Sequence, residues 1–166
     1  IISLSATATE MLFAVGAGDQ VLAVDSYSDY PPEAPTSDLS AFTPNVEAIA
    51  GLEPDLVIIS FDPNGLVEAL TGLGIPVISQ GTAVTLSDSF SQMEVLGVAT
   101  GNVAEAATAV ADIQRQIDEI AASITPSDTP LTYFHELGSE LYSATSATFI
   151  GEIYGIFGLV NIADSE

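Results

Sequence analysis

Strand and helix signals alternate along the first half of this 166-residue chain, and no other feature limits the fold as strongly. Short apolar runs predict strands at 1–4, 21–24, 55–60 and 75–79, and a helical pattern separates each from the next. Strands joined through helices pair in parallel, because each crossover returns the chain to the same edge of the sheet. The sequence therefore predicts an α/β protein built on a parallel sheet.

Two of the intervening helices carry start signals. Thr7 and Glu10 have the spacing of a capping box, and Gly16 is a natural stop for the helix that follows them. Thr43 and Pro44 suit the cap and the first position of the next helix. The three helices of this half are expected at 7–18, 43–52 and 64–74.

The alternation stops after residue 86. A stripe of apolar residues at helical spacing predicts one helix over 102–124, which would be about 34 Å long. Two prolines end it, a new strand is expected at 131–137, and a further helix at 150–158.

This order predicts two Rossmann-like lobes with parallel sheets, joined by a single long α-helix. The N-terminal α/β ligand-binding lobe is expected at 1–86, the helical region at 87–126 and the start of a C-terminal α/β lobe at 127–166. Only about 40 residues remain for the second lobe, which is near the lower limit for independent stability. We therefore expect this lobe to be incomplete in the chain.

The charge balance excludes several classes of protein. The chain has 23 acidic residues, one Arg and no Lys, for a formal net charge of −22. Nothing here could neutralise the phosphates of a nucleic acid or an anionic lipid surface. No apolar run is long enough for a membrane helix. Adaptation to high salt, where screening relieves the self-repulsion, is one hypothesis for the acidity, and a soluble, self-repelling surface is the other.

Machinery for catalysis is not visible. The chain has no Cys and one histidine, His135, so a thiol nucleophile and a zinc site made of several histidines are excluded. No phosphate-binding loop or nucleophile elbow is present, and "GAGDQV" follows a helix where a dinucleotide fingerprint would open one. We expect no enzyme, no catalytic residue, no bound metal and no cofactor. A Rossmann-type enzyme domain that acts on a bound cofactor is the alternative.

Aromatic residues are expected where ligands bind in parallel sheets, at the carboxyl ends of the strands. The loop "DSYSDYPPEA" leaves the second strand with Tyr27 and Tyr30, Phe61 follows the third strand, and Phe42 precedes the next helix. Such a rim suits a large, flat, partly apolar ligand that is neutral or cationic. The alternative is that these rings anchor their loops on the sheet.

The chain resembles the periplasmic substrate-binding proteins of ABC importers for vitamin B12 and ferric siderophores. The likeness rests on "IISLSATATEMLFAVGAGDQVLAVDSYSDYPPEA", "NVEAIAGLEPDLVIIS", "LGIPVIS", the long helix and "TFIGEIYGIFGLVNIAD", and "SYSDYPPEA" points to the cobalamin-binding branch. The resemblance implies a monomeric protein that captures a metal chelate in a cleft between its lobes. It would then deliver the chelate to a permease and its ATPase. The location would be periplasmic or extracellular, with a lipid anchor left open.

The resemblance also implies roles for single residues. Tyr27 matches a pocket tyrosine of the family, while Phe42 and Phe61 stand where larger aromatic rings are usual. Glu47 and Glu152 match the glutamates that each lobe presents to arginines of the permease, although an ordinary exposed acid is the alternative for both.

His135 and Tyr142 are cleft candidates from the second lobe. His135 follows that lobe's first strand and could be an axial ligand to cobalt or haem iron, or a hydrogen-bonded structural residue.

Overall fold

The computed structural model describes residues 1–125, 128–140 and 142–165. These residues form two compact units. The N-terminal unit contains Ile1–Thr82 and Gln92–Ala109, and the C-terminal unit contains Ala83–Ser91 and the chain from Val110 onward.

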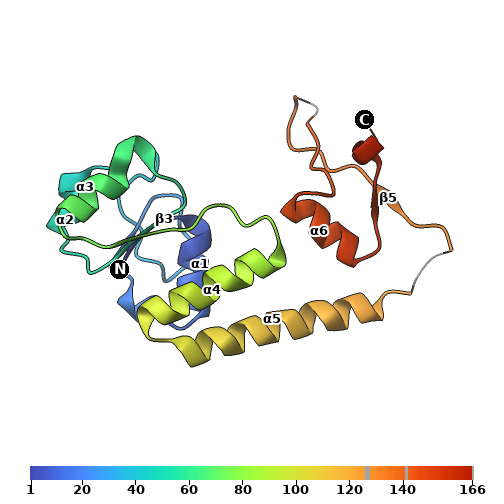
Figure 1. Cartoon of the computed structure of the whole chain (residues 1–166), viewed down its shortest axis with the longest axis horizontal. Coiled ribbons are helices and arrows are strands. Elements are labelled where there is room, and N and C mark those ends of the chain that lie inside the picture. Colours follow the sequence, from blue (N-terminus) through green and yellow to red (C-terminus); the bar gives the residue numbers. More distant parts are fainter. Residues whose placement is uncertain (126–127, 141, 166) are drawn as a thin grey trace. The chain divides into compact units, whose positions relative to one another are not determined.

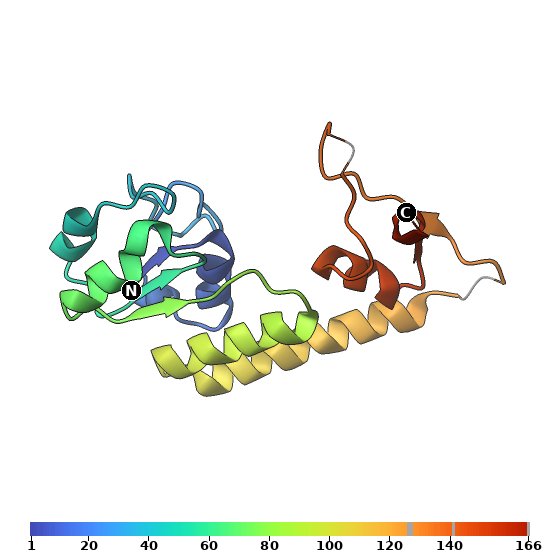
Figure 2. The same ribbon diagram turned by 45° about the horizontal axis from the view of Figure 1, so that its top comes forward.

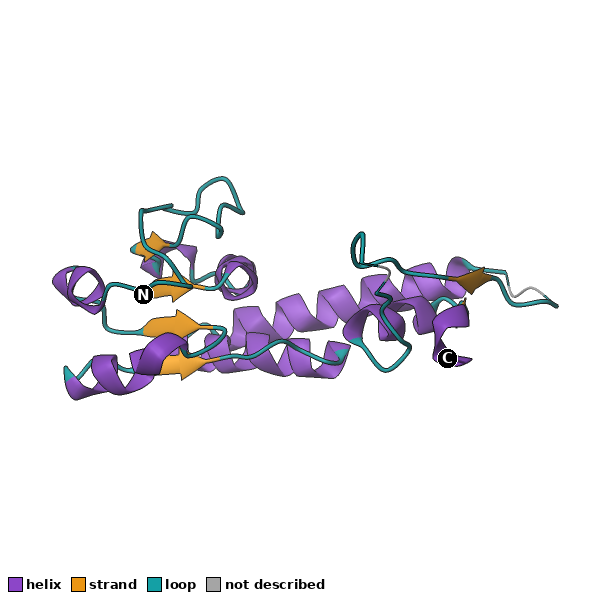
Figure 3. Cartoon of the chain, turned by 90° about the horizontal axis from the view of Figure 1, so that it is seen from above, coloured by secondary structure: helices purple, strands orange, loops and turns teal. Residues whose placement is uncertain are grey.

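A four-stranded parallel sheet forms the centre of the N-terminal unit (Figures 1 and 3). Its strands are β1 (Ile2–Leu4), β2 (Ala23–Val24), β3 (Val57–Ile59) and β4 (Val77–Ser79), in the order β2-β1-β3-β4. Ile2 pairs with both Ala23 and Val57, and Val57 pairs with Val77. The predicted parallel sheet is therefore confirmed, and each strand is shorter than its apolar run.

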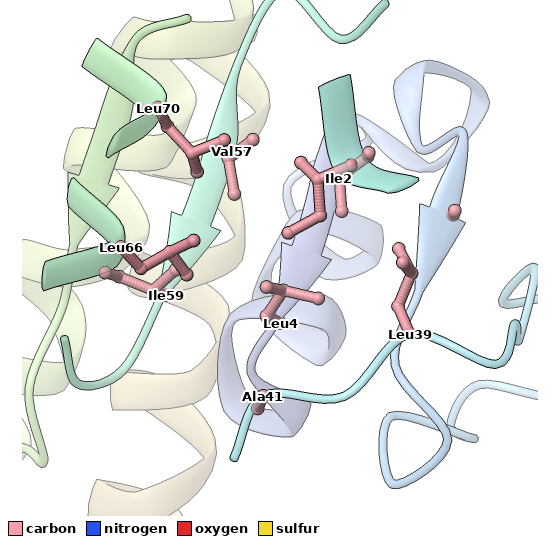
Figure 4. Close-up of a cluster of buried hydrophobic side chains, with 10 residues drawn as sticks. Ile2, Leu4, Leu39, Ala41, Val57, Ile59, Leu66 and Leu70 are labelled. Carbon is pink, nitrogen blue, oxygen red and sulfur yellow. The ribbon is translucent and has the colours of Figure 1, made fainter. Parts of the chain in front are cut away.

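The core of this unit follows from side chains that alternate along the strands. Ile2, Leu4, Val57 and Ile59 point to one face, where Ile49, Leu66 and Leu70 cover them from α2 (Val46–Gly51) and α3 (Leu66–Gly72) (Figure 4). On the other face, Ser3 accepts a hydrogen bond from the hydroxyl of Thr9 in α1 (Ala6–Ala14). α1 and the pair α2 and α3 accordingly lie on opposite sides of the sheet (Figures 1 and 2).

The caps of two helices differ from the prediction. α1 begins after Ser5, which is extended and accepts a hydrogen bond from the Ala8 N–H at 3.3 Å, so Thr7 lies inside the helix and is not its cap. α2 begins after Asn45, whose side chain accepts from the Ala48 N–H at 3.0 Å, so Thr43 and Pro44 precede it. In both helices a good capping side chain adjacent to the first turn prevails over the predicted motif. Gly16 follows α1 with φ +78° and stops it as predicted.

Two long helices follow the sheet. α5 (Val103–Ser123) confirms the predicted long helix to within one residue at each end, while α4 (Leu86–Thr100) was not predicted as a separate helix. The two helices approach closely at Gly97, where an added Cβ would collide with the Cβ of Ala106. Asn102, in the turn between them, donates its side-chain N–H to the Val15 carbonyl and so fixes the turn to the end of α1.

The C-terminal unit contains a short parallel pair, β5 (Thr132–Tyr133) and β6 (Val160–Asn161), with α6 (Phe149–Ile156) between them in sequence. The predicted strand at 131–137 is reduced to two residues, because Glu136 pairs instead with Ser143 in an isolated antiparallel bridge. The remaining short helices are 3-10 turns at Gly18–Gln20, Pro63–Gly65 and Ile162–Ser165. Within the described ranges, no helix combines the length and hydrophobicity needed to cross a bilayer.

Candidate functional site

The carboxyl ends of β2 and β3 and the segment before α2 bring three aromatic rings together. Tyr27 and Phe42 meet edge to face, with ring centroids 5.9 Å apart and an interplanar angle of 89°. Phe42 and Phe61 lie 5.5 Å apart at 40°. We call these three residues the aromatic trio. Their contacts confirm that the rings share one rim, which is what the sheet topology predicted.

The trio is open to solvent. Tyr27 is 70% exposed, Phe42 is 62% exposed and Phe61 is 41% exposed. The alternative prediction, in which the rings anchor their loops on the sheet, requires burial that these residues do not have. Exposed rings in mutual contact form a surface on which a flat apolar group can pack.

Buried neighbours hold Phe42 outward. Leu39 and Ala41 belong to the core cluster, whereas Phe42, the next residue along the chain, is exposed and directs its ring toward solvent. The Ser40 hydroxyl accepts hydrogen bonds from the backbone and the hydroxyl of Thr43, both at 3.1 Å, and closes the turn that follows.

Phe61 depends on the end of β3. Ile59 is buried in the core, and the chain leaves the sheet two residues later at Phe61. The Asp62 carboxylate accepts a hydrogen bond from the Val67 N–H at 3.0 Å, across the turn that Asn64 and Gly65 make with positive φ. This closed turn places Phe61 at the rim without burying it.

Tyr30, the fourth aromatic residue predicted for the rim, is also exposed and precedes a cis peptide bond to Pro31. Among the described residues, the ring contacts of this rim involve the trio and not Tyr30. Its assignment to the site stays a prediction.

The two candidates in the C-terminal unit have different surroundings. His135 is half-buried, and its Nδ1 lies 3.0 Å from the hydroxyl of Tyr154, whose ring packs 4.1 Å from that of Tyr133. Tyr142 is exposed, and its carbonyl accepts a hydrogen bond from the Leu137 N–H. His135 therefore has the hydrogen bond expected of a structural histidine.

Glu47 and Glu152 also differ. Glu47 is exposed in the first turn of α2, and neither of the two ion pairs of the described residues involves it. Glu152 lies in the first turn of α6, where its Oε2 accepts a hydrogen bond from the Leu86 N–H at 2.6 Å. Only Glu47 is the plain exposed carboxylate that the docking prediction assumed for both.

The rim has no positively charged side chain of its own among the described residues. Arg115, the single Lys or Arg of the chain, is held on α5 between Asp112 and Glu119. The described residues contain no group of three or more side chains suited to hold a metal ion. The rim can therefore offer apolar stacking and hydroxyl hydrogen bonds, but no fixed cation for an anionic group.

Sequence reasoning missed two polar residues at this rim, Asp25 and Ser28. Both are buried, and they hydrogen-bond to each other at 3.0 Å. The signal was an Asp directly after a strand with a Ser three residues later, which is a common way to close a turn.

The unit has the α/β architecture of Rossmann-like folds, in which ligands usually bind at the carboxyl ends of the strands, where the aromatic trio lies. The chain belongs to the periplasmic binding protein family, whose sequence model matches residues 1–166. The resemblance drawn from the sequence is thereby confirmed.

Individual relatives carry more specific names. The vitamin B12-binding protein of Pectobacterium atrosepticum is 33% identical over 171 residues, covering 98% of this chain and 61% of its own length. The periplasmic vitamin B12 binding protein BtuF of Vibrio cholerae has a crystal structure with TM-score 0.72 and 29% identity, covering 97% of this chain and 64% of that one.

A haem-binding protein shares the fold as well. The periplasmic heme binding protein HutB of Vibrio cholerae has TM-score 0.82 at 24% identity, covering 96% of this chain and 64% of that one, and this likeness concerns the fold alone. The chain spans about three fifths of the length of the curated relatives that it matches. That share agrees with the prediction of two lobes of which the second is incomplete here.

Proposed function

We propose that the full-length protein is the substrate-binding component of an ABC importer and that its cargo is cobalamin or a related corrinoid. The observation that carries this proposal is the aromatic trio, an exposed stacking surface without a fixed cation at the carboxyl ends of the strands. A corrin ring is broad and flat, and its amide groups are neutral, so it suits such a surface. The relatives named for vitamin B12 support the same ligand.

The protein acts by binding and release, and it catalyses no reaction. Cobalt or iron enters as part of the cargo, so the protein itself needs no resident cofactor. It works as a monomer in the periplasm or outside the cell, where a lipid anchor would keep it near a permease and its ATPase. Tyr30, His135 and Tyr142 are further residues that we propose for ligand contact.

A ferric chelate or haem is the second ligand class. The half-buried His135 favours it, because a histidine can serve as an axial ligand to iron. The lack of a cation at the rim weighs against it, because haem carries two carboxylates and many ferric siderophores are anionic.

Titration calorimetry on the full-length protein separates these ligands. We expect cyanocobalamin to bind at one site per chain, and hemin or a ferric hydroxamate to bind more weakly. Tyr27→Ala and Phe61→Ala should each weaken cyanocobalamin binding by about 0.5–1.5 kcal/mol beyond the loss of buried area. Leu73→Ala, an exposed apolar residue just after α3, is the control and should leave affinity unchanged.

Two outcomes contradict the proposal. Binding of hemin but of no corrinoid would move the protein to the second ligand class. If Tyr27→Ala and Phe61→Ala lost several kcal/mol of folding stability but bound ligand normally once folded, the trio would be a structural cluster and the binding surface would lie elsewhere.

A further inference from the structure

Asp25 is a buried carboxylate at the start of the loop that carries Tyr27. It follows β2 directly and is 2% exposed. The two ion pairs of the described residues both involve Arg115, so no cation pairs with Asp25 in this part of the chain. A buried carboxylate without a cation is costly and is retained only where its hydrogen bonds compensate.

Both hydrogen bonds of the Asp25 side chain close one short turn. Its Oδ1 accepts from the Tyr27 N–H at 2.9 Å and from the Ser28 hydroxyl at 3.0 Å. Its backbone carbonyl accepts from the Ser28 N–H at 3.2 Å, and its own N–H donates to the Ser3 carbonyl in β1. The turn is thus attached to β1 through the Asp25 N–H and closed internally by the bonds from Tyr27 and Ser28 to Asp25.

The turn leaves Tyr27 with its backbone bonded inward and its ring exposed. Ser26, one residue before, donates its N–H to the Leu39 carbonyl at 3.3 Å, which connects this turn to the segment bearing Phe42. Tyr27 and Phe42 meet edge to face, and these two connections join the segments that carry them. Without the carboxylate, the Tyr27 N–H and the Ser28 hydroxyl would lose their common acceptor.

We infer that Asp25 is a positioning residue, whose side chain holds Tyr27 against Phe42 before ligand arrives and thereby sets the affinity of the aromatic trio. The predicted effect of Asp25 on ligand affinity rests on the proposed function. Its predicted effect on the contact between Tyr27 and Phe42 does not. A ring that is already placed loses less freedom when a ligand stacks on it. Asp25 acts here as a hydrogen-bond acceptor, and its negative charge is not what the ligand senses.

The test compares four variants of the full-length protein. Asp25→Ala removes the acceptor, whereas Asp25→Asn keeps an oxygen of nearly the same position and removes the charge. Ser28→Ala removes one of the two bonds and covers the case in which Asp25→Ala does not fold. Asp29→Ala is the matched control, because it is an exposed acid four residues further along the same loop.

Two measurements are made on each variant. The first is the nuclear Overhauser contact between the rings of Tyr27 and Phe42 without ligand. The second is the dissociation constant for cyanocobalamin, with thermal unfolding recorded alongside. We expect Asp25→Ala to lose the ring contact and bind about tenfold more weakly, and Asp25→Asn and Asp29→Ala to keep the contact and bind within about twofold of the parent. Ser28→Ala should weaken both the ring contact and the binding of cyanocobalamin, but abolish neither.

The two readouts separate the inference from the proposed function. If the parent protein binds no corrinoid, the proposed function fails, and the ring contact alone decides whether Asp25 positions Tyr27. An intact ring contact in Asp25→Ala, or in Ser28→Ala if the former does not fold, overturns the inference. Loss of affinity in Asp25→Asn with the ring contact intact also overturns it, because the charge would then be what the ligand senses.

Discussion

At the scale of single residues, the hydrogen bonds that a carboxylate already accepts decide whether it is available to another protein. Asp25 and Asp62 use their carboxylates inside the loops of the rim, and Glu152 uses one oxygen on the Leu86 N–H. Glu47 lies near a helix N-terminus, which favours a carboxylate, and it is exposed. It is therefore the better placed of the two acids that we propose for docking on a permease.

We predict that Glu47→Ala leaves ligand affinity unchanged and slows uptake in cells that carry the cognate permease. Charge pairs of this kind set encounter rate and orientation more than affinity, so the loss should be greatest at low ionic strength. The uptake rate is measured with labelled cyanocobalamin at low and high ionic strength. The control is Glu68→Ala, since Glu68 is also an exposed acid in the first turn of its helix. Equal uptake by the Glu47→Ala and Glu68→Ala variants would contradict a docking role and show that Glu47 is an ordinary surface acid.

Glu152 needs a different substitution because of its bond to Leu86. Glu152→Ala would both remove a charge and leave the Leu86 N–H without its acceptor. Glu152→Gln keeps an acceptor and removes the charge, so only this variant tests docking. Combined with Glu47→Ala, it should slow uptake further than either change alone.

At the scale of elements, α4 shows how a cap can depend on pH. The Asp88 carboxylate accepts hydrogen bonds from the Val84 and Thr85 N–H groups at 3.1 and 2.9 Å, and the Thr85 hydroxyl accepts from the Asp88 N–H at 3.0 Å. Hydrogen bonding with the Thr85 side chain, then with the backbone of Thr85 and Val84, holds the pKa of Asp88 below its ordinary value. This is a reciprocal capping box.

The lowered pKa of Asp88 fixes the sign of a pH effect. The stabilisation is fully present above the pKa of an unfolded Asp, about 3.9, and is lost as pH falls through the lower folded value. We therefore predict that Asp88→Asn lowers the thermal midpoint at pH 7 and that the difference from the parent vanishes in strong acid. Thermal unfolding from pH 7 to below pH 3 measures this difference. A constant difference across that range would show that the carboxylate's charge contributes nothing to the cap.

Element types were predictable from the sequence because they depend on long patterns. The four apolar runs and the stripe of α5 each repeat a signal over many residues, and β1 to β4 and α5 formed where expected. Helix starts depend on one hydrogen bond, so Ser5 and Asn45 could replace the predicted caps without disturbing any pattern.

The aromatic trio was predictable and Asp25 was not, for a related reason. In a parallel sheet the topology alone gathers the residues that follow each strand, so Tyr27 and Phe61 had to lie at one edge. The bond from Asp25 to Ser28 depends on the local turn and on burial, neither of which composition reveals. The short β5 shows the same limit, because the bridge between Glu136 and Ser143 draws the chain away from the strand.

At the scale of the whole molecule, charge is the dominant feature. The 23 acidic residues face one Arg, and that Arg already has two acidic neighbours. Repulsion among the remaining acids opposes the folded state more than the expanded chain, where the charges lie further apart. Salt should relieve it, because the screening length falls from about 10 Å at 0.1 M to about 3 Å at 1 M.

We predict that the thermal midpoint of the full-length protein rises steadily between low and molar KCl. The physical reason is screening, so a variant with fewer acids should need less salt. Glu10→Gln, Glu68→Gln and Glu94→Gln together remove three exposed charges, and no other described residue hydrogen-bonds to these side chains. This triple variant should be more stable than the parent at low salt, and the two should converge near 1 M. Sucrose in place of KCl separates screening from general stabilisation, since it strengthens burial without carrying charge. A midpoint indifferent to KCl, or a triple variant that keeps the parent's salt dependence in full, would show that self-repulsion does not limit this fold.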